Sequence, residues 1–232
     1  MEHIQEIFEQ EGGTFILPLS SIEDRLKRVK AYIFDWDGVF NDGTKHHEYG
    51  SPFSEVDAMG TNMLRFSHYL RTGEVPATFV VTGEKNDSAR VLAEREHFNG
   101  FYFKVKDKAK ALEHICEFHG LVPSQICFVY DDILDLSLAV KAGLRMMVRH
   151  TGNPMFRELI KTDYMAEYIT GSAGGQGAVR EICELLMSLN HDFRKVVSHR
   201  SSFTDAYTDY LDTRQAQNTH YYTLKGLNIV TP

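Results

Sequence analysis

The sequence predicts an α/β fold in which a doubly wound parallel sheet carries helices on both faces. Short apolar runs rich in Val, Ile, Phe and Tyr recur along the chain, and stretches with helical apolar spacing lie between them. Gly73, Gly120 and Gly143 stand where helix C-caps are expected, each soon followed by the next apolar run. Strands that alternate with helices form parallel sheets, because a helix makes the return path between parallel strands.

The elements follow one another in a regular order. Each predicted strand is a short apolar run with aromatic or β-branched residues, and each predicted helix repeats its apolar residues every three to four positions. The predicted strands are AYIFDW (31–36), ATFVVT (77–82), FYFKV (101–105), ICFVY (126–130), RMMVR (145–149) and EYIT (167–170). The predicted helices lie within 63–73, 88–98, 108–120, 134–143 and 177–189.

Three segments depart from this alternation. Residues 41–56 carry Gly43, Gly50 and Pro52 between short polar-aromatic pieces, which predicts a β-hairpin inserted after the first strand. Residues 190–232 are aromatic and polar without a sustained period, so we interpret them as a C-terminal arm. Residues 1–29 form an N-terminal extension that holds one short capped helix, which leaves 30–189 as the main domain.

The composition excludes several classes of protein. The formal net charge of −7 offers no excess of Lys and Arg for nucleic acid or an anionic membrane. No run approaches the roughly 18 apolar residues of a membrane-spanning helix, and the acidic start lacks the order of a signal peptide, so we expect a cytoplasmic protein without nucleic-acid or membrane partners. The three cysteines have no CxxC spacing, which argues against a disulfide framework and a zinc site.

Polar residues gather where the predicted strands end. In an open parallel sheet the carboxyl ends of the strands meet at one edge, where helix N-termini also point. The residues at these positions are Asp35 and Asp37 after the first strand, Thr82 and Gly83 after the second, Lys106 and Lys108 after the third, and Asp131, Asp132 and Asp135 after the fourth. Several carboxylates together without Cys or His favour Mg²⁺, which removes their mutual repulsion.

This set of groups suits phosphoryl transfer. A carboxylate beside a divalent ion can attack phosphorus when the ion, a lysine and fixed N–H donors neutralise the phosphoryl oxygens. A second carboxylate two residues away can protonate the leaving oxygen and later activate water. Glycine at positions 38 and 83 leaves room for backbone N–H groups near the phosphate.

Four segments resemble the successive motifs of the haloacid dehalogenase superfamily of phosphohydrolases. They are DWDGVFNDG (35–43), VVTGEK (80–85), Lys108 in VKDKAKAL (105–112) and DDILD (131–135), and the resemblance covers roughly residues 30–188. Within that superfamily, DGVFNDG, VKDK and GGQGAVREICELL are similar to the phosphatases of 3-deoxy-octulosonate 8-phosphate and nonulosonate 9-phosphate sugars. The resemblance implies a HAD-like Rossmannoid sheet.

The resemblance also implies residue roles. Asp35 would be the nucleophile and Asp37 the general acid and base. The remaining implied roles are Mg²⁺ binding by Asp35, the main-chain oxygen of Asp37 and Asp131, support of the metal site by Asp132 and Asp135, and phosphate binding by Thr82, Gly83 and Lys108.

Spacing and resemblance together predict an uncapped enzyme that assembles. About 45 residues separate Asp37 from Thr82 and about 23 separate Lys108 from Asp131, which leaves no room for a separate cap domain. Because such a site would be open in a monomer, a neighbouring subunit is expected to cover it. The resembling sugar phosphatases are tetramers built around their hairpins, so we expect a homotetramer.

Several residues bear on the substrate. Glu84 and Lys85 follow the Thr-Gly pair where the octulosonate enzymes usually carry Arg, which favours a nonulosonate or similar acidic sugar phosphate. The glycines at 174, 175 and 177 are either a plain loop or, with Arg180, a backbone that reaches a neighbour's substrate carboxylate. Tyr130 replaces the Gly that usually precedes the Asp pair and could crowd the metal loop.

The sequence thus predicts a Mg²⁺-dependent phosphomonoester hydrolase that forms an aspartyl-phosphate on an acidic sugar phosphate. One alternative is a broad-specificity or different sugar phosphatase. Another is a non-catalytic scaffold or regulatory subunit that retains the fold. The complete set of motif residues favours the enzyme.

Overall fold

A computed structural model describes residues 2–46 and 50–232 as one nine-stranded, mostly parallel sheet flanked by helices. The strand order is β1-β7-β6-β5-β2-β3-β4-β8-β9. The strands are β1 (Thr14–Phe15), β2 (Ala31–Phe34), β3 (Ala77–Val81), β4 (Gly100–Phe103), β5 (Ile126–Tyr130), β6 (Leu144–Arg149), β7 (Tyr168–Ala173), β8 (His220–Lys225) and β9 (Asn228–Val230). All pairs are parallel except the outermost, β1 with β7 and β8 with β9.

The helices lie between these strands and at both ends of the described chain. They are α1 (Glu2–Gln10), α2 (Leu19–Leu26), α3 (Glu55–Thr72), α4 (Asp87–Arg95), α5 (Lys108–His119), α6 (Leu136–Ala139), α7 (Pro154–Thr162), α8 (Ala178–Leu189), α9 (Phe193–Ser201) and α10 (Asp205–Gln215). Two short 3-10 turns, Pro123–Gln125 and Ile133–Asp135, flank β5. The six predicted strands and the helices between them are confirmed, and so is the α/β class.

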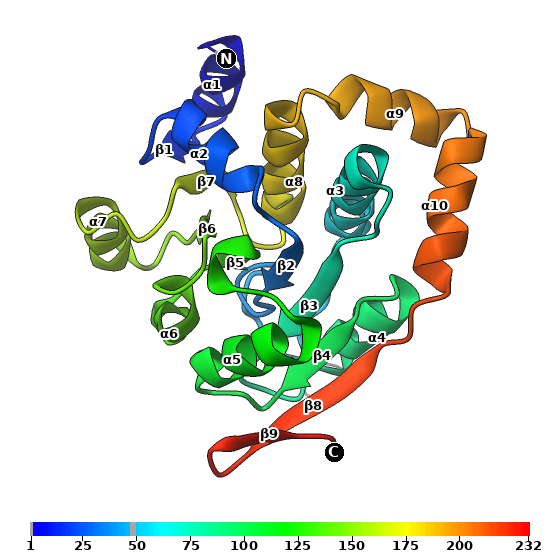
Figure 1. Ribbon diagram of the computed structural model, residues 1–232. Helices are drawn as coiled ribbons and strands as arrows, with labels where there is room; N and C mark the ends of the chain where they lie inside the picture. The colour runs from blue at the N-terminus through cyan, green and yellow to red at the C-terminus, as the bar shows by residue number, and fades with distance from the viewer. Residues whose placement is uncertain (1, 47–49) are drawn as a thin grey trace.

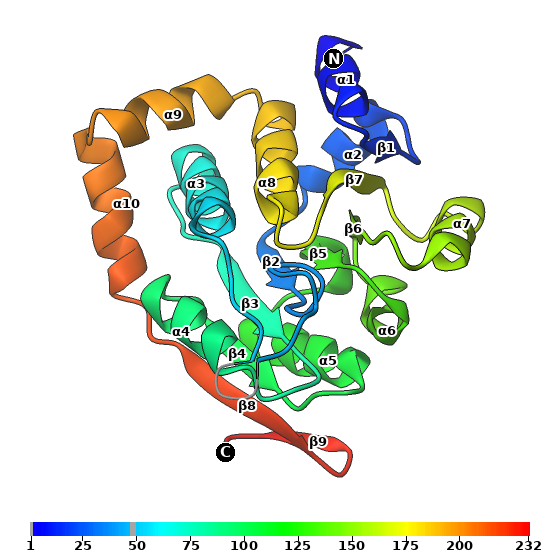
Figure 2. The ribbon, with the colours of Figure 1, turned by 180° about the vertical axis from the view of Figure 1, so that it is seen from behind.

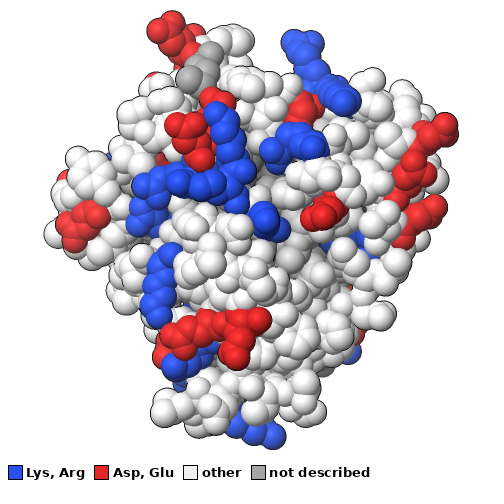
Figure 3. All heavy atoms as spheres, viewed as in Figure 1, with Lys and Arg blue, Asp and Glu red and all other residues white. Residues whose placement is uncertain are grey.

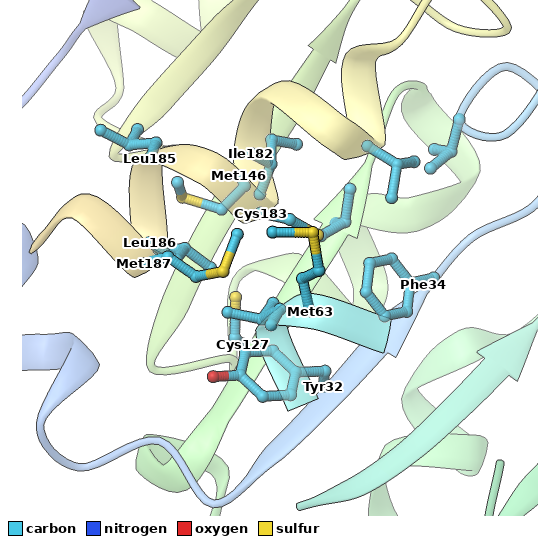
Figure 4. Close-up of a cluster of buried hydrophobic side chains, with 14 of the residues drawn as sticks. Tyr32, Phe34, Met63, Cys127, Met146, Ile182, Cys183, Leu185, Leu186 and Met187 are labelled. Atoms are coloured by element: carbon cyan, nitrogen blue, oxygen red, sulfur yellow. The ribbon is translucent and has the colours of Figure 1, made fainter. Parts of the chain in front are cut away.

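Each face of the sheet has its own apolar core, as a doubly wound sheet requires. One core joins β2, β5 and β6 to α3, α4 and α8, and Figure 4 shows part of it, with Met63, Cys127 and Cys183 close together. The other core packs α5, α6 and α7 against the opposite face. All three cysteines are free thiols, of which Cys127 and Cys183 are buried and Cys116 is partly buried.

Helix ends follow the local chemistry of the sequence. Ser54 caps α3 by accepting the N–H of Val56, and Gly73 ends that helix with a left-handed φ of 76°. Gly120 ends α5 in the same way. Gly143 differs from the prediction because α6 ends earlier, at Ala139. Position 143 needs glycine for another reason: the backbone passes close to the carbonyl oxygen of Ser124, which would lie 2.3 Å from a Cβ.

The insertion predicted over 41–56 is shorter in the structure, since α3 already begins at Glu55, and no cap domain is present in the described part of the chain. Its two sides meet at an antiparallel bridge between His46 and Gly50, and residues 47–49 between them lie outside the described part of the chain. The indole Nε1 of Trp36 donates to the Ser51 carbonyl oxygen at 3.1 Å, which ties the returning side to the end of β2.

The C-terminal segment is more regular than its sequence period suggested. Figures 1 and 2 agree that α9 and α10 bend around α3 before β8 joins the edge of the sheet beside β4. Tyr207 and Tyr210 are buried, with ring centroids 5.1 and 5.2 Å from that of Phe66 on α3. Single aromatic rings, and no apolar stripe, pack α10 against α3. The division into a domain with terminal extensions stays a prediction.

The distribution of charged side chains and the character of the helices bear on the partners expected from the composition. On the face drawn in Figure 3, acidic and basic side chains are intermixed. Among the described residues, none of the helices combines the length and the apolar character that crossing a bilayer requires.

His68 on α3 gives the fold a predicted sensitivity to acid. Burial lowers its pKa to about 4, and its Nδ1 has no hydrogen-bond partner among the described residues. Unfolding restores the ordinary pKa, so the unfolded state binds the proton first and stability falls as the pH drops below about 6.5. We expect this group to remove about 2 kcal/mol of unfolding free energy between about pH 7.5 and about pH 5.

Urea unfolding of the wild type and of His68→Leu, at about pH 7.5 and about pH 5, isolates the contribution of His68 to the unfolding free energy. Asp57 works in the opposite direction, because burial raises its pKa to about 6 and its contribution is lost as pH rises. The readout is therefore the unfolding free energy of the variant minus that of the wild type. This difference should increase as the pH falls, because only the wild type loses stability through His68. A constant difference would contradict the assignment, and the exposed His3→Gln serves as control.

Candidate active site

The carboxyl ends of β2 and β5 place two aspartates side by side. These strands are parallel neighbours with Phe34 opposite Val129, and the N–H of Asp35 donates to the Val129 carbonyl oxygen at 2.9 Å. Asp35 and Asp131 therefore leave the two strands at the same level. They lie in a cavity of about 520 Å³, whose lining also includes Asp37, Gly38, Gly83, Lys108, Asp132 and Asp135. All the predicted strand-end residues except Thr82 line this cavity, and Thr82 is buried beneath it.

Lys108 connects two of the carboxylates at the base of this cavity. Its ammonium forms ion pairs with Asp35 and Asp135, and all three side chains are buried. Burial by itself lowers the pKa of Lys108, but Asp135 and Asp35 outweigh this effect and raise it above its ordinary value. The lysine therefore stays charged and supplies a fixed positive group beside Asp35.

Asp35 and Asp131 are held in surroundings that disfavour their charge. Burial, with repulsion from Asp135, raises the pKa of Asp35 to about 7 despite its contact with Lys108. Burial, with repulsion from Asp35 and Asp135, raises the pKa of Asp131 to about 9. Both groups would gain from a cation that compensates the lost hydration.

The site fits a divalent cation. One carboxylate oxygen from each of Asp35, Asp131 and Asp135 lies within 4.8 Å of the others, and the Oδ1 of Asp131 is buried without a hydrogen-bond partner in the described structure. Oxygen-only ligands suit Mg²⁺ or a similar hard ion. Asp135 is already engaged, since its Oδ2 accepts the N–H groups of Asp131 and Asp132. Asp131, whose Oδ1 is unpaired, is consequently the freest of the three ligands.

Gly38 is required where the loop after β2 passes Asp131. Its φ is +86°, and a Cβ at this position would lie 2.0 Å from the Oδ2 of Asp131. Any side chain there would collide with a carboxylate that can bind the cation. This close approach explains the glycine of the DWDGV segment.

Asp37 points into a cluster of donors that the sequence did not reveal. Its Oδ1 accepts from the hydroxyl of Ser51 at 2.7 Å, and its Oδ2 accepts from Lys45 Nζ at 2.9 Å and Asn86 Nδ2 at 2.8 Å. Lys45 and Ser51 both belong to the inserted segment, so the insertion contacts the predicted acid and base directly.

Asn86 links Asp37, which follows β2, to Thr82, which follows β3. Besides Asp37, its Nδ2 donates to the Oγ1 of Thr82 at 2.8 Å, and the residue is buried with a left-handed φ of 34°. Asparagine tolerates this conformation better than most residues. The signal in the sequence was an Asn just ahead of a helix, which more often marks an ordinary cap.

Comparisons with known proteins agree with this geometry. The 3-deoxy-D-manno-octulosonate 8-phosphate phosphatase of Escherichia coli K12 is 29% identical over 169 residues, covering 70% of this chain and 81% of the relative. A hydrolase of HAD superfamily subfamily III A from Legionella pneumophila matches with a TM-score of 0.66 and 24% identity, covering 79% of this chain and 96% of the other. No protein-family model matches the chain.

The chain is a phosphomonoesterase with the haloacid dehalogenase fold. It resembles the octulosonate 8-phosphate phosphatases. The Moraxella catarrhalis enzyme, whose structure is a complex with magnesium, phosphate and the KDO sugar, superposes with a TM-score of 0.64 at 24% identity. That match covers 81% of this chain and all of the Moraxella chain.

The remaining motif residues of the phosphatase differ in whether they are buried or line the cavity. Thr82 is buried at the end of β3, and Gly83 beside it is open, since a Cβ there would meet no atom within 4 Å. Glu84 is exposed and lines the cavity, whereas Lys85 is exposed beside Asp87 and does not line it. Only Glu84 of this pair is therefore positioned to meet a ligand within one chain.

Arg180 lies away from this cavity in the phosphatase chain. Its Nε donates to Glu184 Oε1 at 2.6 Å, and its backbone N–H donates to the buried Asp57 at 2.9 Å. A Cβ on Gly60 would come within 3.0 Å of the Arg180 Cα, so α3 and α8 cross here in close contact. A role for Arg180 toward a neighbouring subunit stays a prediction.

Two features that the sequence left open have structural explanations. Tyr130 donates its hydroxyl to the Met165 carbonyl oxygen at 2.9 Å and stacks on Phe128, so its ring belongs to the core and does not line the cavity. Gly174 packs on the loop after β2, where a Cβ would lie 2.0 Å from the carbonyl oxygen of Gly38. The glycines near the end of β7 thus support the active-site loop of their own chain.

Proposed function

We propose that the phosphatase hydrolyses the phosphomonoester of a small acidic sugar with Mg²⁺, through an aspartyl-phosphate on Asp35. The observation that supports this most strongly is the arrangement of Asp35 and Asp131 with the charged Lys108 at the base of one cavity. Mg²⁺ bound by Asp35, Asp131 and the main-chain oxygen of Asp37 would draw charge from the phosphoryl oxygens.

The first chemical step uses Asp35 and Asp37. A carboxylate oxygen of Asp35 bonds to phosphorus while the bond between phosphorus and the sugar oxygen breaks, and Asp37 gives its proton to that oxygen. Lys108, Thr82 and the N–H groups near Gly83 stabilise the charge on the phosphoryl group. Since Asp37 now accepts three hydrogen bonds, it must exchange some of them to carry this proton.

The second step regenerates the carboxylate. Asp37, ionised after the first step, removes a proton from water as the water oxygen attacks phosphorus. The bond from Asp35 to phosphorus breaks, inorganic phosphate leaves, and Asp35 recovers its charge. Asp132 and Asp135 support the reacting groups without bonding to phosphorus. Asp135 does so by pairing with Lys108 and by accepting the N–H groups of Asp131 and Asp132.

The mouth of the cavity suits an acidic sugar. Lys45, Lys106 and His150 line it together with Glu84, so both cationic and hydrogen-bonding groups face the space beyond the phosphate. Relatives named as octulosonate 8-phosphate phosphatases support an acidic sugar phosphate as substrate. The Glu84–Lys85 pair favours the nonulosonate 9-phosphates within that class, and a homotetramer that covers the open mouth remains our expectation.

Phosphate release from a panel of esters tests this proposal. The panel contains octulosonate 8-phosphate, nonulosonate 9-phosphates, neutral hexose phosphates and p-nitrophenyl phosphate, each with Mg²⁺. We expect kcat/KM to be highest for one acidic sugar, by roughly 10-fold or more over the neutral esters. Equal turnover of all esters would favour the broad-specificity alternative and remove the substrate assignment.

Lys45→Met provides a matched variant for the same panel. Losing the ammonium should raise KM for acidic sugar phosphates by roughly 10-fold while changing the neutral esters less, because only the former carry a carboxylate for it to bind. A uniform loss on every ester would instead show that Lys45 serves only Asp37.

A further inference from the structure

Another, smaller cavity lies between α3, the end of α4 and the C-terminal helices α9 and α10, and none of its lining residues belongs to the four phosphatase motifs. Its volume is about 290 Å³. Three arginines from three different helices line it, Arg95, Arg200 and Arg214, together with Glu55 and Glu96. Figure 1 shows α9 and α10 passing around α3 toward α4.

Both carboxylates of this cavity are already committed. Glu96 pairs with Arg214 at 2.7 Å and with Arg95 at 3.1 Å, and Glu55 pairs with Arg95 at 2.6 Å. The arginines consequently outnumber their partners. This local positive excess stands out in a chain whose formal net charge is −7.

Arg200 is the arginine without a counter-ion. It takes part in no ion pair within residues 2–46 and 50–232, and its Nε is buried without a hydrogen-bond partner there. Its guanidinium lies over the rings of Phe203 and Tyr207, 4.6 and 4.9 Å from their centroids. Stacking fixes the plane of the guanidinium and leaves its N–H edge to bind an acceptor.

Arg214 gives an independent indication that an acceptor is missing. The residue is only 7% exposed, and although Nη1 binds Glu96, its Nε is buried without a partner in the described structure. Buried guanidinium donors are normally satisfied, because an unpaired one loses its hydration for nothing. An anion in the cavity would neutralise Arg200 and add an acceptor beside Arg214, which also lines the cavity.

We propose that this cavity binds a small anion that carries a phosphate or carboxylate group, held by Arg200 and Arg214. Both groups offer the paired oxygens that a guanidinium binds with two parallel hydrogen bonds. The volume suits inorganic phosphate or a small metabolite. The inference does not depend on the proposed sugar substrate, since none of its residues lines the active-site cavity.

Crystals of the full chain soaked in tungstate, a phosphate mimic with strong anomalous scattering, test the site directly. We expect one anomalous peak near Asp35 and a second between Arg200 and Arg214. In Arg200→Gln the second peak should vanish while the first remains. The control Arg90→Gln removes an exposed arginine of α4 that pairs with Glu94, and it should keep both peaks.

Calorimetric titration with inorganic phosphate at constant ionic strength adds a measurement in solution. The wild type should bind phosphate in this cavity at least about 10-fold more tightly than Arg200→Gln, and Arg214→Lys should also weaken binding because an ammonium lacks the planar fork that holds two anion oxygens. Turnover of Arg200→Gln should equal that of the wild type. Absence of the second peak in wild-type crystals, or unchanged phosphate affinity in Arg200→Gln, would overturn the proposal.

Discussion

The Asp35→Asn variant is expected to lose phosphatase activity by roughly 10³-fold or more, because an amide cannot form the phosphorylated intermediate. The fold should survive the change. Lys108 keeps its ion pair with Asp135, and a buried carboxylate that resists ionisation is replaced by a neutral group of the same shape. Initial rates of phosphate release measure the loss, and circular dichroism with thermal unfolding checks the fold.

A nearby aspartate supplies the control for this loss. Asp42 is exposed on the inserted segment and accepts the N–H of Thr44, so Asp42→Asn makes the same chemical change close to the cavity without touching its base. We expect this variant to retain most of the activity. If Asp35→Asn kept more than about one tenth of wild-type turnover, the nucleophile would have to be another residue.

Removal of divalent cations is expected to have the second large effect, on both activity and stability. The buried carboxyl groups of Asp35 and Asp131 have pKa values raised to about 7 and about 9, so each is costly to ionise without a cation. Chelation should abolish turnover, and Mg²⁺ should restore it. At saturating Mg²⁺ we expect Tm to rise by roughly 5–10 °C, the gain from binding only the folded state.

Asp131→Asn separates the cation's effect from general stabilisation by salt. This variant loses a ligand and a repelling charge together, so its metal-free Tm should equal or exceed that of the wild type, while Mg²⁺ should no longer raise it. Thermal scans with chelator and with Mg²⁺ measure both quantities. An identical Mg²⁺ response in Asp131→Asn and the wild type would place the ion elsewhere, and turnover that survives chelation would exclude a metal role.

The fold and the base of the site were predictable because both follow from short-range patterns. Apolar runs and helical spacing locate the central strands, and parallel strands carry their end residues to one edge. Asp35, Lys108 and Asp131 therefore meet as the sequence indicates. Thr82, at the end of the next strand β3, is linked to Asp37 through Asn86.

The surroundings of Asp37 were not predictable in the same way. Lys45 and Ser51 reach it from an insertion whose path depends on tertiary contacts such as Trp36 with Ser51. Asn86 takes an unusual backbone conformation that composition does not reveal. The C-terminal helices escaped notice because single rings, Tyr207 and Tyr210, replace a periodic apolar stripe. Tyr130 appeared intrusive only because its direction from the strand was unknown.

The place of β8 has a consequence for how the chain reaches its native state on the ribosome. β4 (Gly100–Phe103) emerges early, yet its outer hydrogen-bonding partner is β8 (His220–Lys225), which follows only after α9 and α10 have been made. During synthesis the β4 edge therefore stays open to pairing with other nascent chains. Pairing between strands so far apart in the sequence slows folding. The β4 edge is therefore protected from aggregation only once β8 has paired with it.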